Sequence, residues 1–130
     1  MKYKLYTLGN EFIKEVSQSP VNFTGIIEYS NGAKEWFVDG KRHRTDDPAC
    51  EYSDGSKHWF VDGKQHRTDG PASEYSNGSK HWYVDGKLRR TDGPASEYSN
   101  GSKYWFVDGK QVTKEQHDLL FGIMKLKGLL

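Results

Sequence analysis

The side chains best suited to chemistry are imidazoles and carboxylates that recur along the chain. They are His43, His58, His66, His81, Asp39, Asp62 and Asp85. No two of these histidines have the helical i, i+4 spacing of a zinc site, and the single cysteine rules out a Cys-x-x-Cys pair. Each of these aspartates also precedes a glycine, where a turn uses it. The sequence therefore predicts no metal ion and no cofactor.

Catalysis would need one distinctive arrangement of reactive groups. Serine is abundant, but none lies in the Gly-x-Ser-x-Gly context that presents a hydrolase nucleophile. Glu51 and Glu74 could be drawn as a glycosidase carboxylate pair. Each, however, has a basic partner in its own part of the sequence. We expect no enzyme, because a repeated sequence supplies the same groups several times over.

These groups recur because the chain repeats itself every 23 residues. One position of the repeat is held by Trp36, Trp59, Trp82 and Trp105. A fixed period of this length indicates a tandem array of one supersecondary unit. We expect an N-terminal capping strand region at 1–27, four tandem units at 28–112 and an amphipathic helix at 113–130, within a single domain.

Each unit contains two hairpin signals. Asn77-Gly78 and Asp85-Gly86 both favour two-residue type I′ turns, whose central residues need positive φ. The segment between them is aromatic and β-branched, as strands are. The third unit is thus expected to form strands at 72–76, 79–84 and 87–90. The predicted fold is an all-β repeat protein: an antiparallel meander of hairpins in a solenoid-type sheet, with a short C-terminal capping α-helix.

Two-residue turns also predict which side chains share a face. Glu74, His81 and Arg90 would line up across three strands, with Trp82 and Tyr75 on the opposite face. The second unit supplies Glu51, His58 and Arg67 to this row, and the first unit supplies Glu28, Glu35 and Arg44. This row is either a structural ladder of opposite charges or a polar, histidine-containing groove that binds a partner.

The tryptophan position allows two interpretations as well. The four indoles stack between neighbouring units as the core, or they form a solvent-facing platform for bases or sugars. The eleven residues that we consider candidates for binding are Arg44, Arg67, Arg90, His58, His81, Glu51, Glu74, Trp36, Trp59, Trp82 and Trp105.

The two ends depart from the repeat. Lys2 to Tyr6 alternates in polarity and predicts an N-terminal strand. Thr113 and Gln116 form a capping-box pattern for a helix over 114–127. The apolar side of this helix is formed by Leu119, Leu120, Ile123, Met124 and Leu126. We expect the helix to fold back and cover the open sheet edge; its presentation to a second chain is the alternative.

Composition narrows the class of protein further. Hydrophobic residues make up 34% and aromatic residues 14%, which favours thin sheets covered by large rings. The net charge of +1 gives no overall attraction to long nucleic acids or anionic membranes. Cys50 has no internal partner, and no apolar stretch has the length of a signal peptide core or membrane span. A cytoplasmic protein without membrane contact is expected.

The string Tyr75-Ser76-Asn77-Gly78-Ser79-Lys80, followed by an aromatic strand and Asp85-Gly86-Lys87, resembles the MORN repeat and its bacterial variant. Residues 27–112 carry this likeness. The array is still more similar to the uncharacterised His-Arg-x-Asp-Gly-Pro-Ala repeat proteins of tailed phages. The resemblance implies an extended antiparallel sheet used for protein contacts, in an accessory protein of the infected host cytoplasm that could counter a host defence. The Arg-Thr-Asp-Gly-Pro-Ala linker departs from the MORN pattern, so lipid binding is not carried over.

Three functional classes remain open. The first is an interaction module that binds a bacterial host protein through a sheet face or edge, as a monomer or a homodimer. The second is a binding module for a nucleotide or nucleic acid that uses the repeated arginines and aromatic residues. The third is a structural or virion-associated part.

Overall fold

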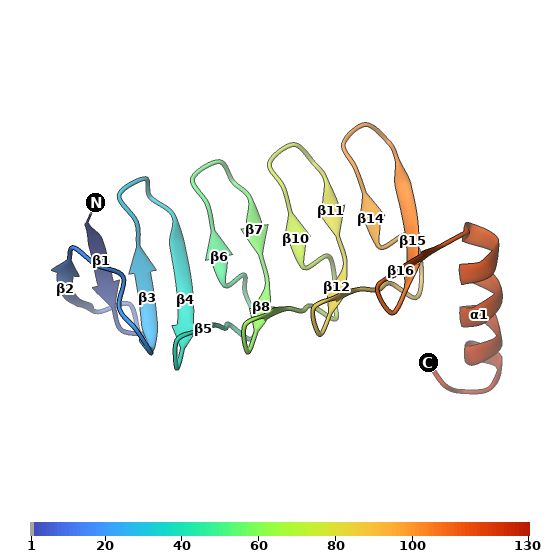
Figure 1. Cartoon of the computed structure of the whole chain (residues 1–130), viewed down its shortest axis with the longest axis horizontal. Helices are drawn as coiled ribbons and strands as arrows, with labels where there is room; N and C mark the ends of the chain where they lie inside the picture. Colours follow the sequence, from blue (N-terminus) through green and yellow to red (C-terminus); the bar gives the residue numbers. More distant parts are fainter. Residues whose placement is uncertain (1) are drawn as a thin grey trace.

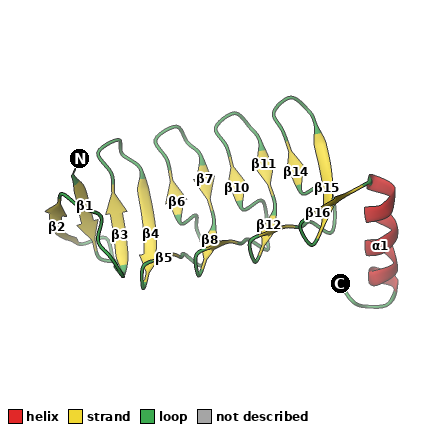
Figure 2. Ribbon diagram, in the orientation of Figure 1, coloured by secondary structure: helices red, strands yellow, loops and turns green. Residues whose placement is uncertain are grey.

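The computed structural model describes residues 2–130. Over this range the chain is an elongated row of antiparallel β-hairpins followed by one helix, α1 (Lys114–Leu126), at the C-terminal end (Figure 1, Figure 2). The antiparallel pairing confirms the prediction of an all-β fold with a C-terminal helix.

One sheet runs the length of the row, and its neighbouring strands follow the order β16-β15-β14-β11-β10-β7-β6-β4-β3-β1-β2. In chain order these strands are β1 (Tyr3–Tyr6), β2 (Phe12–Val16), β3 (Gly25–Glu28), β4 (Lys34–Val38), β6 (Cys50–Glu51), β7 (Lys57–His58), β10 (Ser73–Glu74), β11 (Lys80–His81), β14 (Ser96–Glu97), β15 (Lys103–Val107) and β16 (Lys110–Val112). The remaining strands are β5 (Lys41–Arg42), which pairs with β4, and two separate ribbons, β8 (Phe60–Val61) with β9 (Lys64–Gln65) and β12 (Tyr83–Val84) with β13 (Lys87–Leu88).

The two turns of a unit have different geometries. At the inner turn, Asp85 and Gly86 have φ of 51° and 78°, and Val84 pairs with Lys87, so the type I′ prediction is confirmed. At the outer turn, Gly78 has φ of 94° while Asn77 stays outside the left-handed region. The Gly78 amide donates to the Tyr75 carbonyl. This is a three-residue loop, a type I turn with a G1 bulge, and the predicted type I′ turn is wrong here.

The extra loop residue shifts the strand pairing by one position. Ser73 pairs with His81 and Glu74 pairs with Lys80. The sequence had predicted Glu74 opposite His81. Because successive side chains point to opposite faces, Glu74 and His81 lie on different faces and the predicted Glu-His-Arg row does not form.

A row of alternating charges replaces it. Direct cross-strand pairs link Glu28, Lys34, Glu51, Lys57, Glu74, Lys80, Glu97 and Lys103 in that order. Pairs of opposite charge in this position each stabilise a sheet by about 0.2–1 kcal/mol. Every unit therefore adds one glutamate and one lysine to a continuous ladder.

The tryptophan marks the point where a strand changes partners. The Trp82 amide donates to the Ala95 carbonyl of the next unit, at 2.8 Å. The Trp82 carbonyl accepts from the Arg89 amide of its own unit, at 3.0 Å. The predicted strand 79–84 is consequently divided into β11 and β12. Trp59 makes the corresponding bonds to Ala72 and His66.

The core is thin and lies close to the sheet. Trp36 packs with Ile26 and Ala49, and Tyr6 and Phe60 close this cluster. Trp36 and Trp59 are each 8% exposed, while Trp82 and Trp105 are half-buried. The alanines that receive the tryptophan amides, Ala49, Ala72 and Ala95, are completely buried.

The ends close the sheet in different ways. At the N-terminus, β2 is an edge strand that the sequence did not predict, and it pairs with β1. At the C-terminus, the predicted capping box is present between Thr113 and Gln116. The predicted apolar side of α1 is wrong: His117 and Phe121 are its buried residues.

None of the five residues predicted to form the apolar, packed side of α1 is fully buried. Leu119, Leu120, Ile123 and Leu126 are exposed, and Met124 is half-buried. His117 Nε2 contacts the Arg90 carbonyl at 2.5 Å, so the opposite stripe of the helix faces the array. In residues 2–130 there is no helix with the length and apolar character needed to cross a membrane.

Replacement of Gly78 by alanine isolates the cost of the outer turn. An added Cβ at Gly78 meets nothing within 4 Å, so the left-handed backbone is the only penalty. We expect a loss of about 1–2 kcal/mol in the free energy of unfolding, measured by urea denaturation. The matched control is Gly122→Ala in α1, which is equally open and should gain about 0.5–1 kcal/mol. Equal effects at the two glycines would contradict the turn assignment.

Candidate binding face

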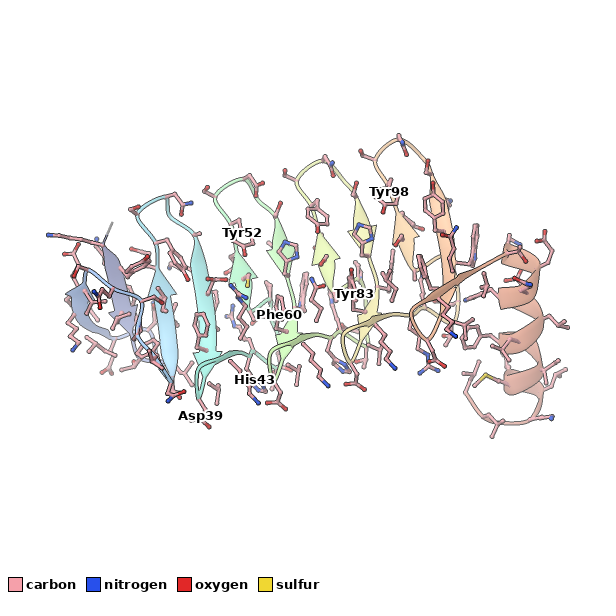
Figure 3. The ribbon with its side chains drawn as sticks, in the orientation of Figure 1. Asp39, His43, Tyr52, Phe60, Tyr83 and Tyr98 are labelled. Carbon is pink, nitrogen blue, oxygen red and sulfur yellow. The ribbon has the colours of Figure 1, made fainter. Side chains whose placement is uncertain are left out.

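One face of the sheet carries a continuous row of rings, which we call the tyrosine–histidine ladder. Its members in order are Tyr52, His58, Tyr75, His81, Tyr98 and Tyr104. Each ring meets the next edge-to-face, with centroids 5.5, 5.2, 5.7, 5.1 and 5.7 Å apart. Figure 3 shows Tyr52 and Tyr98 near the tips of their hairpins. Such arrangements are favoured by the ring quadrupole and fix the rings relative to one another.

The outer turn creates this ladder. Tyr75 follows Ser73 by two residues, so both side chains lie on the same face. The bulge places His81 opposite Ser73 and therefore on that face too. The sequence had placed Tyr75 with Trp82, and this was wrong for the same reason as the register.

Buried hydroxyl groups hold the imidazoles from below. His58 Nδ1 lies 2.8 Å from Ser73 Oγ, and His81 Nδ1 lies 2.9 Å from Ser96 Oγ. Gln65 Nε2 donates to Ser73 Oγ at 2.6 Å. Ser73 and Ser96 are only 1% and 2% exposed. These serines orient the histidine rings and are too deeply buried to attack a substrate.

The imidazoles of the ladder favour their neutral form. Burial lowers the pKa of His58 and His81 below the ordinary value of 6.5. At His58, Asp54 opposes this shift, while Arg42 and His81 add to it. The ladder is therefore an uncharged surface at neutral pH.

The tyrosine rings remain accessible. Tyr52, Tyr75, Tyr98 and Tyr104 are between 39% and 44% exposed, which leaves part of each ring open to a ligand. A groove of about 500 Å³ lies at the C-terminal end of the ladder. It is lined by Tyr98, Asn100, Ser102, Tyr104, Phe106 and Gln111.

The ladder does not continue into the first unit, where the buried carboxylate of Glu35 occupies the position of the histidine. Glu35 replaces the histidine and accepts hydrogen bonds from the Tyr29 hydroxyl, from Arg42 Nε at 2.7 Å and from Cys50 Sγ at 3.2 Å. Burial raises the pKa of Glu35, but these three hydrogen bonds outweigh it and the pKa lies below its usual value. Burial also raises the pKa of Cys50 to about 12, and Glu35 adds to that shift.

The predicted arginines lie over the tryptophans, away from the ladder. The guanidinium carbons of Arg44, Arg67 and Arg90 are each 3.9 Å from a ring centroid. The partner rings are those of Trp36, Trp59 and Trp82 respectively. This is close cation–π geometry. Trp105 has Thr113 at the corresponding sequence position, and a depression at the start of α1 includes both residues.

Each arginine also reaches forward to the glutamate of the following unit. Arg67 Nε lies 2.8 Å from Asp69, and its Nη1 lies 3.6 Å from Glu74. Arg90 repeats this with Asp92 and Glu97. Arg44 contacts Asp47 at 3.5 Å and Glu51 at 3.8 Å. The structure thus joins arginine, tryptophan and the next glutamate, and it separates all three from His58 and His81.

Another depression lies on the face that carries the arginines, between the segments 67–71 and 89–92 that connect consecutive units. Its volume is about 670 Å³, and its walls include Arg67, Asp69, Trp82, Arg90 and Asp92. The opposite charges that line it are already paired with one another. Within residues 2–130, no three histidine, cysteine, aspartate or glutamate side chains gather as a metal site would need.

Comparison with protein-family models, with curated proteins and with solved structures finds no significant match.

Sequence reasoning missed the tyrosines of the ladder. Three of them, Tyr52, Tyr75 and Tyr98, follow a glutamate and precede the outer turn, as Tyr29 does in the first unit. Their recurrence was visible, but their face depends on whether the Asn-Gly loop has two or three residues. Only the three-residue loop places the tyrosines beside the histidines.

The Cys50 thiol should be unreactive in the folded protein. It is buried, donates to Glu35 and has a raised pKa, so little thiolate forms at neutral pH. We expect iodoacetamide to modify Cys50 only in denaturant, as followed by mass spectrometry. Rapid modification without denaturant would contradict the buried cluster.

The histidines of the ladder should make stability depend on pH. Because their pKa is lower in the folded state than the ordinary 6.5, the unfolded chain binds more protons. Their contribution is therefore complete above about pH 6.5 and declines as the pH falls below it. We expect the melting temperature to fall across this range, and a His58→Gln, His81→Gln double variant to show a shallower fall. An unchanged pH profile in the double variant would refute this assignment.

Proposed function

We propose that this chain is a non-catalytic binding protein whose contact surface for a protein partner is the tyrosine–histidine ladder. The observation that carries the proposal is the row of partly exposed tyrosines held at constant intervals on one face. Tyrosine offers a large amphipathic contact area with little conformational entropy to lose, and it is enriched in protein interfaces.

The bonding of the reactive groups supports a binding role. Ser73 and Ser96 are buried beneath imidazoles, and Cys50 is held by Glu35. In the part of the chain that the structure describes, every buried side-chain nitrogen or oxygen has a hydrogen-bond partner. These groups stabilise the fold through hydrogen bonds, whereas the tyrosine rings are partly exposed and can contact a partner.

The pairing of the arginines weakens the nucleic-acid alternative. Arg44, Arg67 and Arg90 each have two carboxylates within 4 Å. A phosphate would have to compete with these carboxylates, and phosphate contacts supply most of the affinity for nucleic acids. The ladder itself is neutral and presents rings edge-to-face.

The architecture that we propose is a MORN-like solenoid of 23-residue units, in which contacts to the adjacent unit recur at the same step. The resemblance to repeat proteins of tailed phages makes a bacterial protein the partner to test first. A component of a host defence system is the partner class that this resemblance suggests.

Removal of three ladder tyrosines should abolish capture of a partner. The triple variant Tyr52→Ser, Tyr75→Ser, Tyr98→Ser takes away the exposed rings while Trp36 and Trp59 stay in place. Immobilised protein would be incubated with bacterial lysate, and bound proteins quantified by mass spectrometry. We expect partner recovery to fall at least about tenfold, because tyrosine is among the residues whose truncation most often costs an interface much of its binding energy.

The control carries Leu119→Ser and Leu126→Ser, which remove exposed apolar side chains from α1 instead. It should capture the partner as the native chain does. Equal capture by the tyrosine variant, or loss in the helix variant, would refute the proposed function.

A further inference from the structure

The ladder has a repeat distance set by the sheet. One tyrosine is contributed by every second strand, since Tyr52, Tyr75 and Tyr98 follow β6, β10 and β14. Neighbouring strands lie about 4.8 Å apart, so successive tyrosines recur about every 9.6 Å along the array. The intervening position is filled by His58 or His81.

This interval matches one form of polypeptide. A polyproline II helix has three residues per turn and a rise of about 3.1 Å per residue, which gives a turn of about 9.3 Å. An α-helix repeats at about 5.4 Å, and a β-strand presents the same face about every 6.8 Å. A polyproline II segment lying across the strands would therefore present one side chain to each tyrosine in step.

The hydrogen-bonding chemistry of the face suits such a segment. A proline-rich chain has free carbonyl acceptors but few amide donors. Ser73 Oγ accepts from Gln65, and its own proton can be donated to His58 Nδ1, 2.8 Å away. In the tautomer that accepts this proton at Nδ1, Nε2 of His58 is a donor, and the tyrosine hydroxyls add further donors. Donors on the ladder thus meet acceptors on the ligand.

The charge and shape of the face agree with an uncharged ligand. The glutamate–lysine row lies on the opposite face, because Glu74 and Ser73 are adjacent in one strand. The groove at the C-terminal end of the ladder has about 500 Å³ of space, and its aromatic lining is Tyr98, Tyr104 and Phe106. Aromatic-lined grooves are the usual receptors for proline-rich segments.

We propose, resting on the function proposed above, that the ladder binds a proline-rich segment in the polyproline II conformation, which lies along the array with one turn per unit. From Tyr52 to Tyr98 is two intervals, about 19 Å, which six residues of polyproline II span. A ligand of about nine residues would occupy all three tyrosines and the terminal groove.

Peptide titrations of the full chain test this directly. The probes are a capped peptide with proline at every third position, a peptide of the same composition with its prolines unevenly spaced, and a glycine–serine peptide of equal length. Binding is followed by NMR through the ring signals of Tyr52, Tyr75 and Tyr98. We expect saturable binding of the regularly spaced peptide, at least about fivefold weaker binding of the uneven one and none of the glycine–serine peptide.

Variants separate the ladder from other surfaces. Tyr75→Ala should weaken the regular peptide about tenfold, and Tyr52→Ala should act similarly. Leu126→Ser on α1 should leave the affinity unchanged. Because Tyr75 is 43% exposed, the variant should fold, and its near-ultraviolet circular dichroism checks this.

The outcomes distinguish this inference from the proposed function. Equal affinity for the two proline peptides, or for the native chain and Tyr75→Ala, would overturn the inference. A partner that is captured through the tyrosines but lacks a proline-rich segment would overturn it too, while the proposed function would stand. Regular-peptide binding that is lost with Tyr75 supports it.

Discussion

The left-handed glycine of each outer turn decides how the rest of the side chains are distributed. With φ near 90°, Gly32, Gly55, Gly78 and Gly101 each complete a three-residue loop. The loop sets the strand register, and the register determines which side chains share a face. Glutamate and lysine then meet on one face, and histidine, serine and tyrosine meet on the other. A loop shorter by one residue would mix charged and aromatic groups on both faces.

Cohesion between units comes from contacts that point forward along the chain. The tryptophan amide bonds to the next alanine, and the arginine over that tryptophan reaches the next glutamate. His43 and His66 add a further link, because each accepts from the backbone amide of an aspartate in the following inner turn. A thin core of rings and alanines is sufficient because each unit is held by hydrogen bonds and ion pairs on both sides.

Local patterns were enough to predict much of this fold. The antiparallel hairpins, the type I′ inner turn at Asp85-Gly86 and the capping box at Thr113 each follow from a few adjacent residues. The outer turn could not be resolved in this way, because Asn-Gly fits a two-residue loop as well as a type I turn with a bulge. Because the prediction assumed a two-residue loop, it placed Tyr75 and His81 on opposite faces of the sheet.

The other differences between prediction and structure arise from tertiary contacts, which cannot be inferred from the periodicity of the sequence. Apolar residues lie on two sides of α1, and the side that packs on the array is the one whose His117 finds the Arg90 carbonyl. The arginines were expected beside histidine, yet the change of strand partner at the tryptophan turns them toward the indole and the next glutamate. Each of these outcomes depends on a partner distant in sequence.

Each unit supplies two strands to the long sheet. Because two is an even number, the first strand of every unit runs in the same direction; with an odd number, the direction would reverse from one unit to the next. Excision or duplication of the second or third unit, which both carry the histidine, restores the same strand direction, the same alternation of charge and the same order of rings at the junction. Changes in the number of copies would therefore alter the reach of the aromatic surface without disturbing its phase. The length of the aromatic surface is therefore set by the number of these units.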